Sequence, residues 1–429
     1  MGANTPRKAK AFITYTPNGK KPRDSEKIAE YLEAFSYTDC ATGQSDVASI
    51  TLNNMDLKWA NSWLPKKGDK FTAKIKLYSW ETAGTDIVFN CGTFCCDDKE
   101  FSGWPSDAIV GGLSTPEKQA FRSTSRSKTW KNVTIKEIAR QIAKRYSLKL
   151  QYYASTIKIK TLEQDKKDDA SFLNSLCDDY GLYIKVYSGK IVIYDPVKYE
   201  AKAAVKTFSI NDLIDYHYNS TLTGTYTGAT IKYTKGKSKK EYTYKVGSGN
   251  RILSINEKVD NVSDAKLKAK ARLNKENRKA ETMTATFTAN FKLVAGNCIK
   301  IKDAYDMDGK YFIDKATHTI KADGVYTISV EMHKLPSTSA TKTQEPKKKT
   351  TTKKKTTKKK TTSFKVGDKV IVNGGAYYAG NGGRSNSCKG MTMYITQILG
   401  GGYKYQYGVA KRKGGTRYGW CAKSSLTKA

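Results

Sequence analysis

The sequence predicts a mainly β protein with an α+β segment in its middle and a small barrel at its C-terminal end. Runs of β-branched and aromatic residues, interleaved with polar residues and separated by turn residues, occur before residue 100 and again after residue 201. Between these regions, apolar residues recur at helical spacing. The last 66 residues contain 14 Gly, which suits a small, highly curved barrel. With 429 residues, the chain is long enough for about three domains.

Residues 1–100 carry the first set of predicted strands, and we expect them to form a β-barrel domain. The runs that predict these strands are AFITY, FSYTD, ASITL, FTAKIKLYSW and DIVFNCGTF. Residues 101–130 show only weak periodicity. We therefore expect an irregular insertion there.

Residues 131–200 form the predicted α+β domain, with two helices followed by a hairpin. Thr134 is a candidate N-cap of the first helix. The second helix is expected to end at Gly181, and the hairpin is expected to turn at Ser188 and Gly189. The apolar positions at helical spacing are Ile135, Ile138, Ile142 and Tyr146 in the first helix and Phe172, Leu173, Leu176 and Tyr180 in the second.

Three segments make up the rest of the chain. Residues 201–336 are predicted to form a second β-barrel domain, which also holds a Lys-rich helix over 263–279. Residues 337–363 consist mostly of Lys and Thr and contain no large apolar residue, so we expect a disordered linker. Residues 364–429 form the small C-terminal barrel.

The net charge of +36 is distributed unevenly along the chain. Residues 337–363 carry +9 and residues 364–429 carry +10, which leaves +17 for the first 336 residues. Within the last segment, residues 403–420 interleave aromatic and basic side chains, a pattern able to stack bases or sugar rings. A DNA-binding protein is therefore one alternative, and it predicts an affinity that falls steeply with salt.

The sequence contains no arrangement that selects a catalytic site. Nucleophilic catalysis needs a base beside the nucleophile, yet the only histidines are His217, His318 and His333, each in a strand-like run. Cys177 could be paired with His217 on paper, but it falls at the apolar face of its helix. Three cysteines lie close together, but no second pair at zinc-ribbon spacing accompanies them: Cys91, Cys95 and Cys96. We expect a protein that is not an enzyme and has no cofactor and no metal site.

The sequence also bears on where the protein is made. It has no apolar run of about 18 residues and no secretory signal at its start. We therefore expect no membrane span and no signal-dependent export, so that the chain stays in the cytosol where it is made. In that reducing compartment the eight cysteines are not expected to form a disulfide framework.

Residues 1–335 resemble the phage late control protein D family, the baseplate hub proteins of contractile tails. The resemblance rests on FSYTDCATGQSDVASITL with WLPKKGD, on TLEQDKKDDASFLNSLCDDYGLYIKVYSGKIVIYD, and on the closing LVAGNCIKIKD, GKYFIDKATHTI and YTISVEMHKL. It implies two similar barrels around the α+β domain. It further implies a structural homotrimer that joins a hexameric tail tube protein to a trimeric central spike protein and meets baseplate wedge proteins. The particle would be a phage tail or a phage-tail-like bacteriocin, assembled in the bacterial cytoplasm and then released from the cell.

The last 66 residues resemble the bacterial Src-homology-3-like (SH3-like) domains found at the ends of cell-wall lysins. The matching pieces are FKVGDKVIVNGGAYYAGNGG, MTMYITQI and YGWCAKSSLTK. The resemblance implies binding of peptidoglycan through an aromatic groove, with a protein-binding module as the alternative. It also leaves a peptidoglycan hydrolase with a wall-targeting domain as the alternative function of the whole chain. The candidate groove residues are Tyr377, Tyr378, Tyr405, Tyr407, Tyr418 and Trp420.

Overall fold

The computed structural model describes residues 7–23, 25–114, 120–234, 240–259, 261–336, 364–380, 382–400 and 402–429. The chain divides into two compact units, residues 1–348 and 349–429. We call the first unit the body and the second the C-terminal unit. The predicted linker, residues 337–363, lies outside the described residues.

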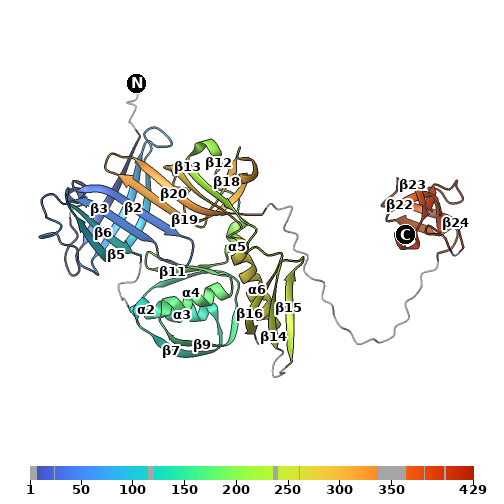
Figure 1. The fold of residues 1–429 in the computed structure, drawn as a ribbon, viewed down its shortest axis with the longest axis horizontal. Coiled ribbons are helices and arrows are strands. Elements are labelled where there is room, and N and C mark those ends of the chain that lie inside the picture. The colour runs from blue at the N-terminus through green and yellow to red at the C-terminus, as the bar shows by residue number, and fades with distance from the viewer. Residues whose placement is uncertain are drawn as a thin grey trace. The chain divides into compact units, whose positions relative to one another are not determined.

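A twelve-stranded sheet forms the largest layer of the body (Figure 1). Its strands run in the order β1-β4-β5-β6-β3-β2-β19-β20-β17-β13, with β18 paired to β19 and β12 to β18. The first half of the sheet comprises β1 (Lys8–Thr16), β2 (Leu32–Cys40), β3 (Val47–Asn53), β4 (Lys70–Tyr78), β5 (Ile87–Ser102) and β6 (Asp107–Leu113), with the short helix α1 (Ser25–Ala29) between β1 and β2. The second half comprises β12 (Thr207–Ser209), β13 (Leu213–Ser220), β17 (Glu281–Thr288), β18 (Cys298–Lys302), β19 (Gly309–Lys321) and β20 (Tyr326–Lys334).

The two halves meet where β2 pairs antiparallel with β19, from Ala34 opposite Lys321 to Cys40 opposite Lys315. The pairings of the described strands make an open path rather than a ring. The described strands thus form no closed barrel, and the predicted β-barrel domains over residues 1–100 and 201–336 are not confirmed. An edge strand leaves backbone N–H and C=O groups unpaired, and β2 and β19 satisfy theirs by joining the halves. One hydrophobic core continues through both halves, from Phe35 and Phe71 to Phe287 and Ile328.

The irregular insertion expected at residues 101–130 is largely regular in the structure. Its first residues complete β5, and β6 lies inside the sheet between β5 and β3. Strand β6 contains Gly111 and Gly112 at positions where a β-branched residue would have indicated a strand. A Cβ at Gly112 would come within 2.5 Å of the Phe71 ring. Close packing of the sheet on these glycines thus removed the alternation that predicts a strand.

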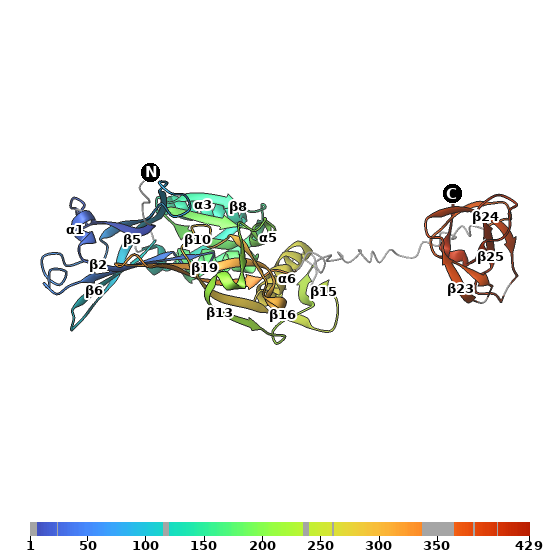
Figure 2. The same cartoon turned by 90° about the horizontal axis from the view of Figure 1, so that it is seen from above.

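The α+β part of the body agrees with the helices and hairpin predicted for residues 131–200. Thr134 caps the first helix by accepting a hydrogen bond from the Glu137 N–H, and the turn residues Ser188 and Gly189 both have positive φ. The elements are α2 (Ala120–Ser123), β7 (Arg126–Thr134), α3 (Ile135–Arg145), β8 (Lys149–Tyr153), β9 (Lys158–Lys167), α4 (Asp169–Asp179), β10 (Tyr183–Tyr187), β11 (Lys190–Tyr194) and α5 (Pro196–Glu200). In the view turned by 90°, α3 and β8 lie to one side of β2 and β19 (Figure 2).

A smaller three-stranded sheet completes the body. It contains β14 (Gly228–Thr234), β15 (Glu241–Gly247) and β16 (Ile252–Val259) in the order β15-β14-β16. The predicted Lys-rich helix is α6 (Val262–Asn277), and it packs Ala265 and Ala269 against this sheet. None of the helices in the described ranges is long and apolar enough to span a membrane.

The C-terminal unit is also mainly β, as predicted. Its seven strands run in the order β23-β22-β26-β25-β24-β21-β27. Their bounds are β21 (Lys369–Val372), β22 (Gly375–Ala379), β23 (Gly382–Ser387), β24 (Met391–Ile398), β25 (Tyr407–Ala410), β26 (Gly419–Cys421) and β27 (Leu426–Lys428). A core that includes Val370, Met393 and Val409 fills the unit.

Candidate functional site

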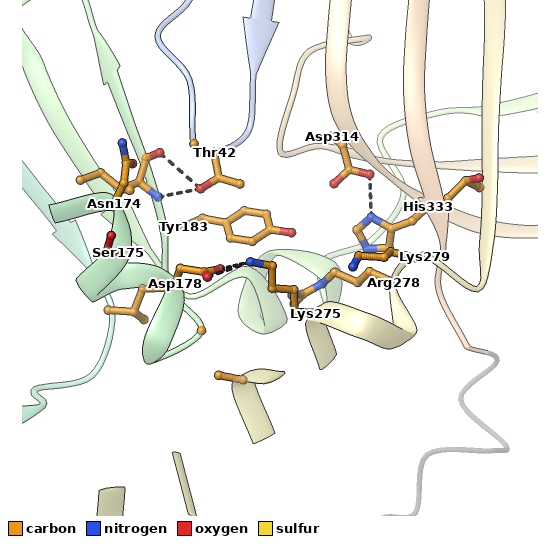
Figure 3. A pocket seen from close by; sticks show the side chains of 16 residues that line it. Thr42, Asn174, Ser175, Asp178, Tyr183, Lys275, Arg278, Lys279, Asp314 and His333 are labelled. Atoms are coloured by element: carbon orange, nitrogen blue, oxygen red, sulfur yellow. Dashed lines mark hydrogen bonds and ion pairs between the residues drawn. The ribbon is translucent and has the colours of Figure 1, made fainter. Parts of the chain in front are cut away.

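The body holds a cavity of about 580 Å³ where the large sheet, α4, β10 and α6 meet. Figure 3 shows Tyr183 between two groups of charged side chains. On one side, Lys275 Nζ lies 2.7 and 2.8 Å from the two carboxylate oxygens of Asp178. On the other side, Asp314 and His333 form a second pair.

The second pair belongs to a chain of four charged groups from three parts of the body. Asp314 occupies a bulge in β19, where the pairing with β20 shifts by one residue. His333 Nδ1 lies 2.7 Å from Asp314 Oδ2, and its Nε2 lies 3.5 Å from Glu200 Oε1. Arg278, the C-cap of α6, donates from Nε to the same Glu200 oxygen over 2.7 Å. The chain therefore ties α5 and α6 to the sheet.

Both ring nitrogens of His333 face carboxylates. Burial disfavours its charged form, but Asp314 and Glu200 outweigh that effect and raise the pKa of His333. A general base needs a free nitrogen aimed at a hydroxyl, a thiol or a water. The geometry instead fits a charged imidazolium that bridges two anions.

The remaining residues weighed for catalysis do not come together in the structure. Cys177 is fully buried in the core between α3 and α4, and burial raises the pKa of its thiol. His217 is exposed on β13, an edge of the large sheet. His318 is buried, with Nδ1 2.6 Å from the Tyr326 hydroxyl, and burial lowers the pKa of its ring to about 4. Within the described ranges, no group of three or more His, Cys, Asp or Glu side chains is placed to hold a metal ion.

A second buried ion cluster joins β10 to the β2–β3 region. Lys185 donates to Asp39, and its Nζ lies 3.1 Å from Asp46. Burial raises the pKa of Asp46 to about 6, against the opposing effect of Lys185. Tyr37 adds a hydrogen bond of 3.0 Å to Asp46. The hairpin of the α+β part is therefore held to the large sheet by charge as well as by packing.

The aromatic residues proposed for wall binding occupy different environments in the C-terminal unit. Tyr377 and Tyr405 stack, with ring centroids 3.8 Å apart, and both are half-buried. Tyr377 lies directly opposite Trp420 in the pairing of β22 with β26. Tyr378 belongs to β22, but its side chain is outside what the structure describes.

Two of the proposed residues are more buried than a surface contact requires. Tyr407 is 7% exposed and packs edge-on against Phe364 in the core. Trp420 is 5% exposed, and the Arg417 guanidinium lies 4.7 Å from its ring centroid. Tyr418 is half-buried, with Lys411 Nζ 4.9 Å from its ring centroid. The structure thus adds Arg417 and Lys411 to the candidate surface, and the alternation of basic and aromatic residues in 403–420 was the sequence signal for both.

Comparisons with known proteins identify the class of fold. Residues 121–333 match the sequence profile of a family described as YQBQ-like. The probable baseplate hub protein of Escherichia phage 186 is 26% identical over 228 residues, which cover 52% of this chain and 56% of that protein. The chain thus matches little more than half the length of this curated relative.

Two solved structures share the fold of about three-quarters of the chain. The tail protein from Neisseria meningitidis MC58 aligns with a TM-score of 0.55 at 11% identity, over 76% of this chain and 96% of that one. The 43 kDa tail protein of prophage MuSo2 from Shewanella oneidensis aligns with a TM-score of 0.52 at 13% identity, over 76% and 97%. The proteins that this chain resembles in sequence and in fold are thus phage tail and baseplate hub proteins.

Proposed function

We propose that the protein is a structural component of a contractile phage tail or phage-tail-like bacteriocin, the baseplate hub, and that it assembles as a trimer. The observation that carries the proposal is the fold, which aligns with the folds of two tail proteins over 76% of the chain. The charged groups of the body support a structural role. His333 and Lys185 link elements of the body to one another through their ion pairs.

Symmetry is the reason to propose a trimer. The large sheet has two halves of six strands each. The first half contains β1–β6, and the second contains β12, β13 and β17–β20. Three copies would present six such halves, a number that matches a hexameric tail tube protein on one side. The threefold arrangement itself matches a trimeric central spike protein on the other side. Baseplate wedge proteins would contact the outer surface.

The C-terminal unit has a separate role in this proposal. Residues 337–363 would act as a linker of like charges, and residues 364–429 would bind the bacterial cell wall. The particle would be assembled in the cytoplasm and released with this unit available to the wall. The unit would then hold the baseplate close to its target while the tail engages.

The proposal is tested with the full chain and with a chain that ends at Leu335. Native mass spectrometry of each, alone and with tube and spike proteins, should show a trimer for both. Sedimentation with purified Gram-positive cell walls should retain the full chain and lose the shortened one. A monomer under all of these conditions would overturn the hub proposal, and equal sedimentation of both chains would overturn the role of the C-terminal unit.

A further inference from the structure

The charge of the C-terminal unit is almost entirely of one sign. Residues 364–429 contain 8 Lys and 3 Arg but a single acidic side chain, Asp368. Asp368 accepts a hydrogen bond from the Lys365 N–H, and Lys428 Nζ lies 3.4 Å from its carboxylate. The unit therefore contains no other carboxylate side chain to neutralise its remaining cations. An anionic ligand would supply the missing charge.

Four of these cations lie in one hairpin loop, residues 411–417, which connects β25 to β26. Lys411, Arg412, Lys413 and Arg417 are all exposed. The loop has a defined shape, because Tyr418 N–H donates to Val409 O over 2.7 Å at its base and Gly415 N–H donates to Arg412 O over 3.0 Å at its tip. We call this segment the cationic hairpin. It holds four positive charges within seven residues on a regular scaffold.

Two aromatic residues that follow the hairpin hold two of its four cations in place. Arg417 lies over Trp420 and also donates to Gln397 Oε1 over 3.2 Å, and Lys411 lies over Tyr418. A cation over a ring is attracted to it and occupies that face. Sugar or base stacking needs open ring faces, whereas Trp420 is 5% exposed and has Arg417 above it. The rings are thus better placed to orient cations than to stack on a neutral glycan.

We propose that the cationic hairpin and the Arg417–Trp420 pair bind a phosphodiester-linked anionic polymer of the bacterial cell wall. The inference rests on the proposed wall-binding role and names the component of the wall that is bound. Arginine suits this ligand because its planar fork can donate two hydrogen bonds to one phosphate. Successive phosphates along the polymer would meet successive cations of the hairpin.

The test uses the full chain and two preparations of the same Gram-positive cell walls. One preparation is intact, and the other has had its phosphodiester polymers removed with cold hydrofluoric acid. We expect binding to fall at least about tenfold on the treated walls, and to fall about tenfold or more between 50 and 200 mM salt on the intact ones. The variant Lys411→Gln, Arg412→Gln, Lys413→Gln, Arg417→Gln should show the same loss on intact walls.

A matched control carries Lys365→Gln, Lys369→Gln, Lys389→Gln and Lys423→Gln, which neutralise four exposed cations outside the hairpin. It should keep most of the binding, and circular dichroism should confirm that both variants are folded. Full binding to the treated walls would overturn the phosphodiester assignment while leaving wall binding intact. No binding to either preparation would overturn the wall-binding role itself. Tighter binding to duplex DNA than to intact walls, again dependent on the hairpin, would replace the wall polymer by nucleic acid.

Discussion

His333 on β20 donates from Nδ1 to Oδ2 of Asp314 over 2.7 Å, and Asp314 is the bulged residue of the neighbouring strand β19. A β-bulge bends its strand and redirects a side chain. Here it places a carboxylate beside a buried imidazole at the junction of the sheet with α5 and α6. The stability of the body therefore depends on whether His333, which lies between Asp314 and Glu200, is protonated.

The stability of the body should fall as the pH rises past the ordinary histidine range. The pKa of His333 is raised in the folded protein, so its contribution is complete below about pH 6.5, the unfolded value, and is lost as the pH rises through the folded pKa. Thermal unfolding of the full chain between pH 6 and pH 9 measures this effect. His333→Gln should flatten that part of the profile, and an unchanged profile in the variant would contradict the assignment.

At the acidic end, Glu200 should produce the opposite dependence. Burial raises its pKa, but His333 and Arg278 outweigh burial and lower it overall. Its contribution is present above its ordinary value of 4.5 and is lost as the pH falls through the depressed pKa. Glu200→Gln should remove this part of the acid sensitivity, measured by unfolding between pH 3 and pH 5. An equally acid-sensitive variant would show that other carboxylates dominate.

Replacing Lys185 should strongly destabilise the body. Lys185→Met would leave the buried carboxylates of Asp39 and Asp46 facing each other without their cation. Removing one member of a buried ion cluster costs about 3–5 kcal/mol. Chemical denaturation measures the loss, and Lys149→Met, at an exposed lysine of β8, is the matched control. Equal losses of stability in both variants would mean that the ion cluster does not stabilise the body.

The two halves of the large sheet should unfold together. Phe35 of β2 is fully buried and lies opposite Ile320 of β19, across the line where the halves join. Phe35→Ala should lower the free energy of unfolding of both halves by the same amount, about 3–5 kcal/mol. Hydrogen exchange followed by mass spectrometry distinguishes β4 from β17. Loss of protection in only one of them would show that the halves are independent.

Two tyrosines separated by one residue should respond differently to truncation. Tyr407→Ala removes a core side chain and should lower the stability of the C-terminal unit by about 3 kcal/mol or more. Tyr405→Ala removes one member of the half-buried stack with Tyr377 and should leave the unit folded. Differential scanning calorimetry of the full chain compares them. Equal destabilisation by both substitutions would place Tyr405 in the core as well.

The local elements of the body could be predicted from sequence because their signals are local. Thr134 caps the start of α3, and Ile135, Ile138 and Ile142 are buried on its inner face. Likewise, Gly181 lies just after the end of α4 and has a positive φ. Periodicity and capping depend on residues within a few positions of one another, so the chain alone carries this information.

Other features depended on residues far apart in the chain. The pairing of β2 with β19 joins positions about 280 residues apart, as between Thr38 and Thr317, and no local pattern distinguishes it from closure of each half on itself. Strand β6 escaped prediction because Gly112 is required by the distant Phe71. The exposure of individual aromatic residues followed the same rule.

By itself, the sequence determined the mainly β class, the helices and hairpin of residues 131–200, the Lys-rich helix, and the charge of the last 66 residues. Only the tertiary structure decided that the two β regions form one sheet, that Asp314 meets His333, and that Arg417 covers Trp420. The physical reason is that backbone pairing and side-chain packing between remote segments depend on which strand edges and apolar faces come into contact in the folded chain. Composition and spacing describe each segment separately and do not specify its distant partners.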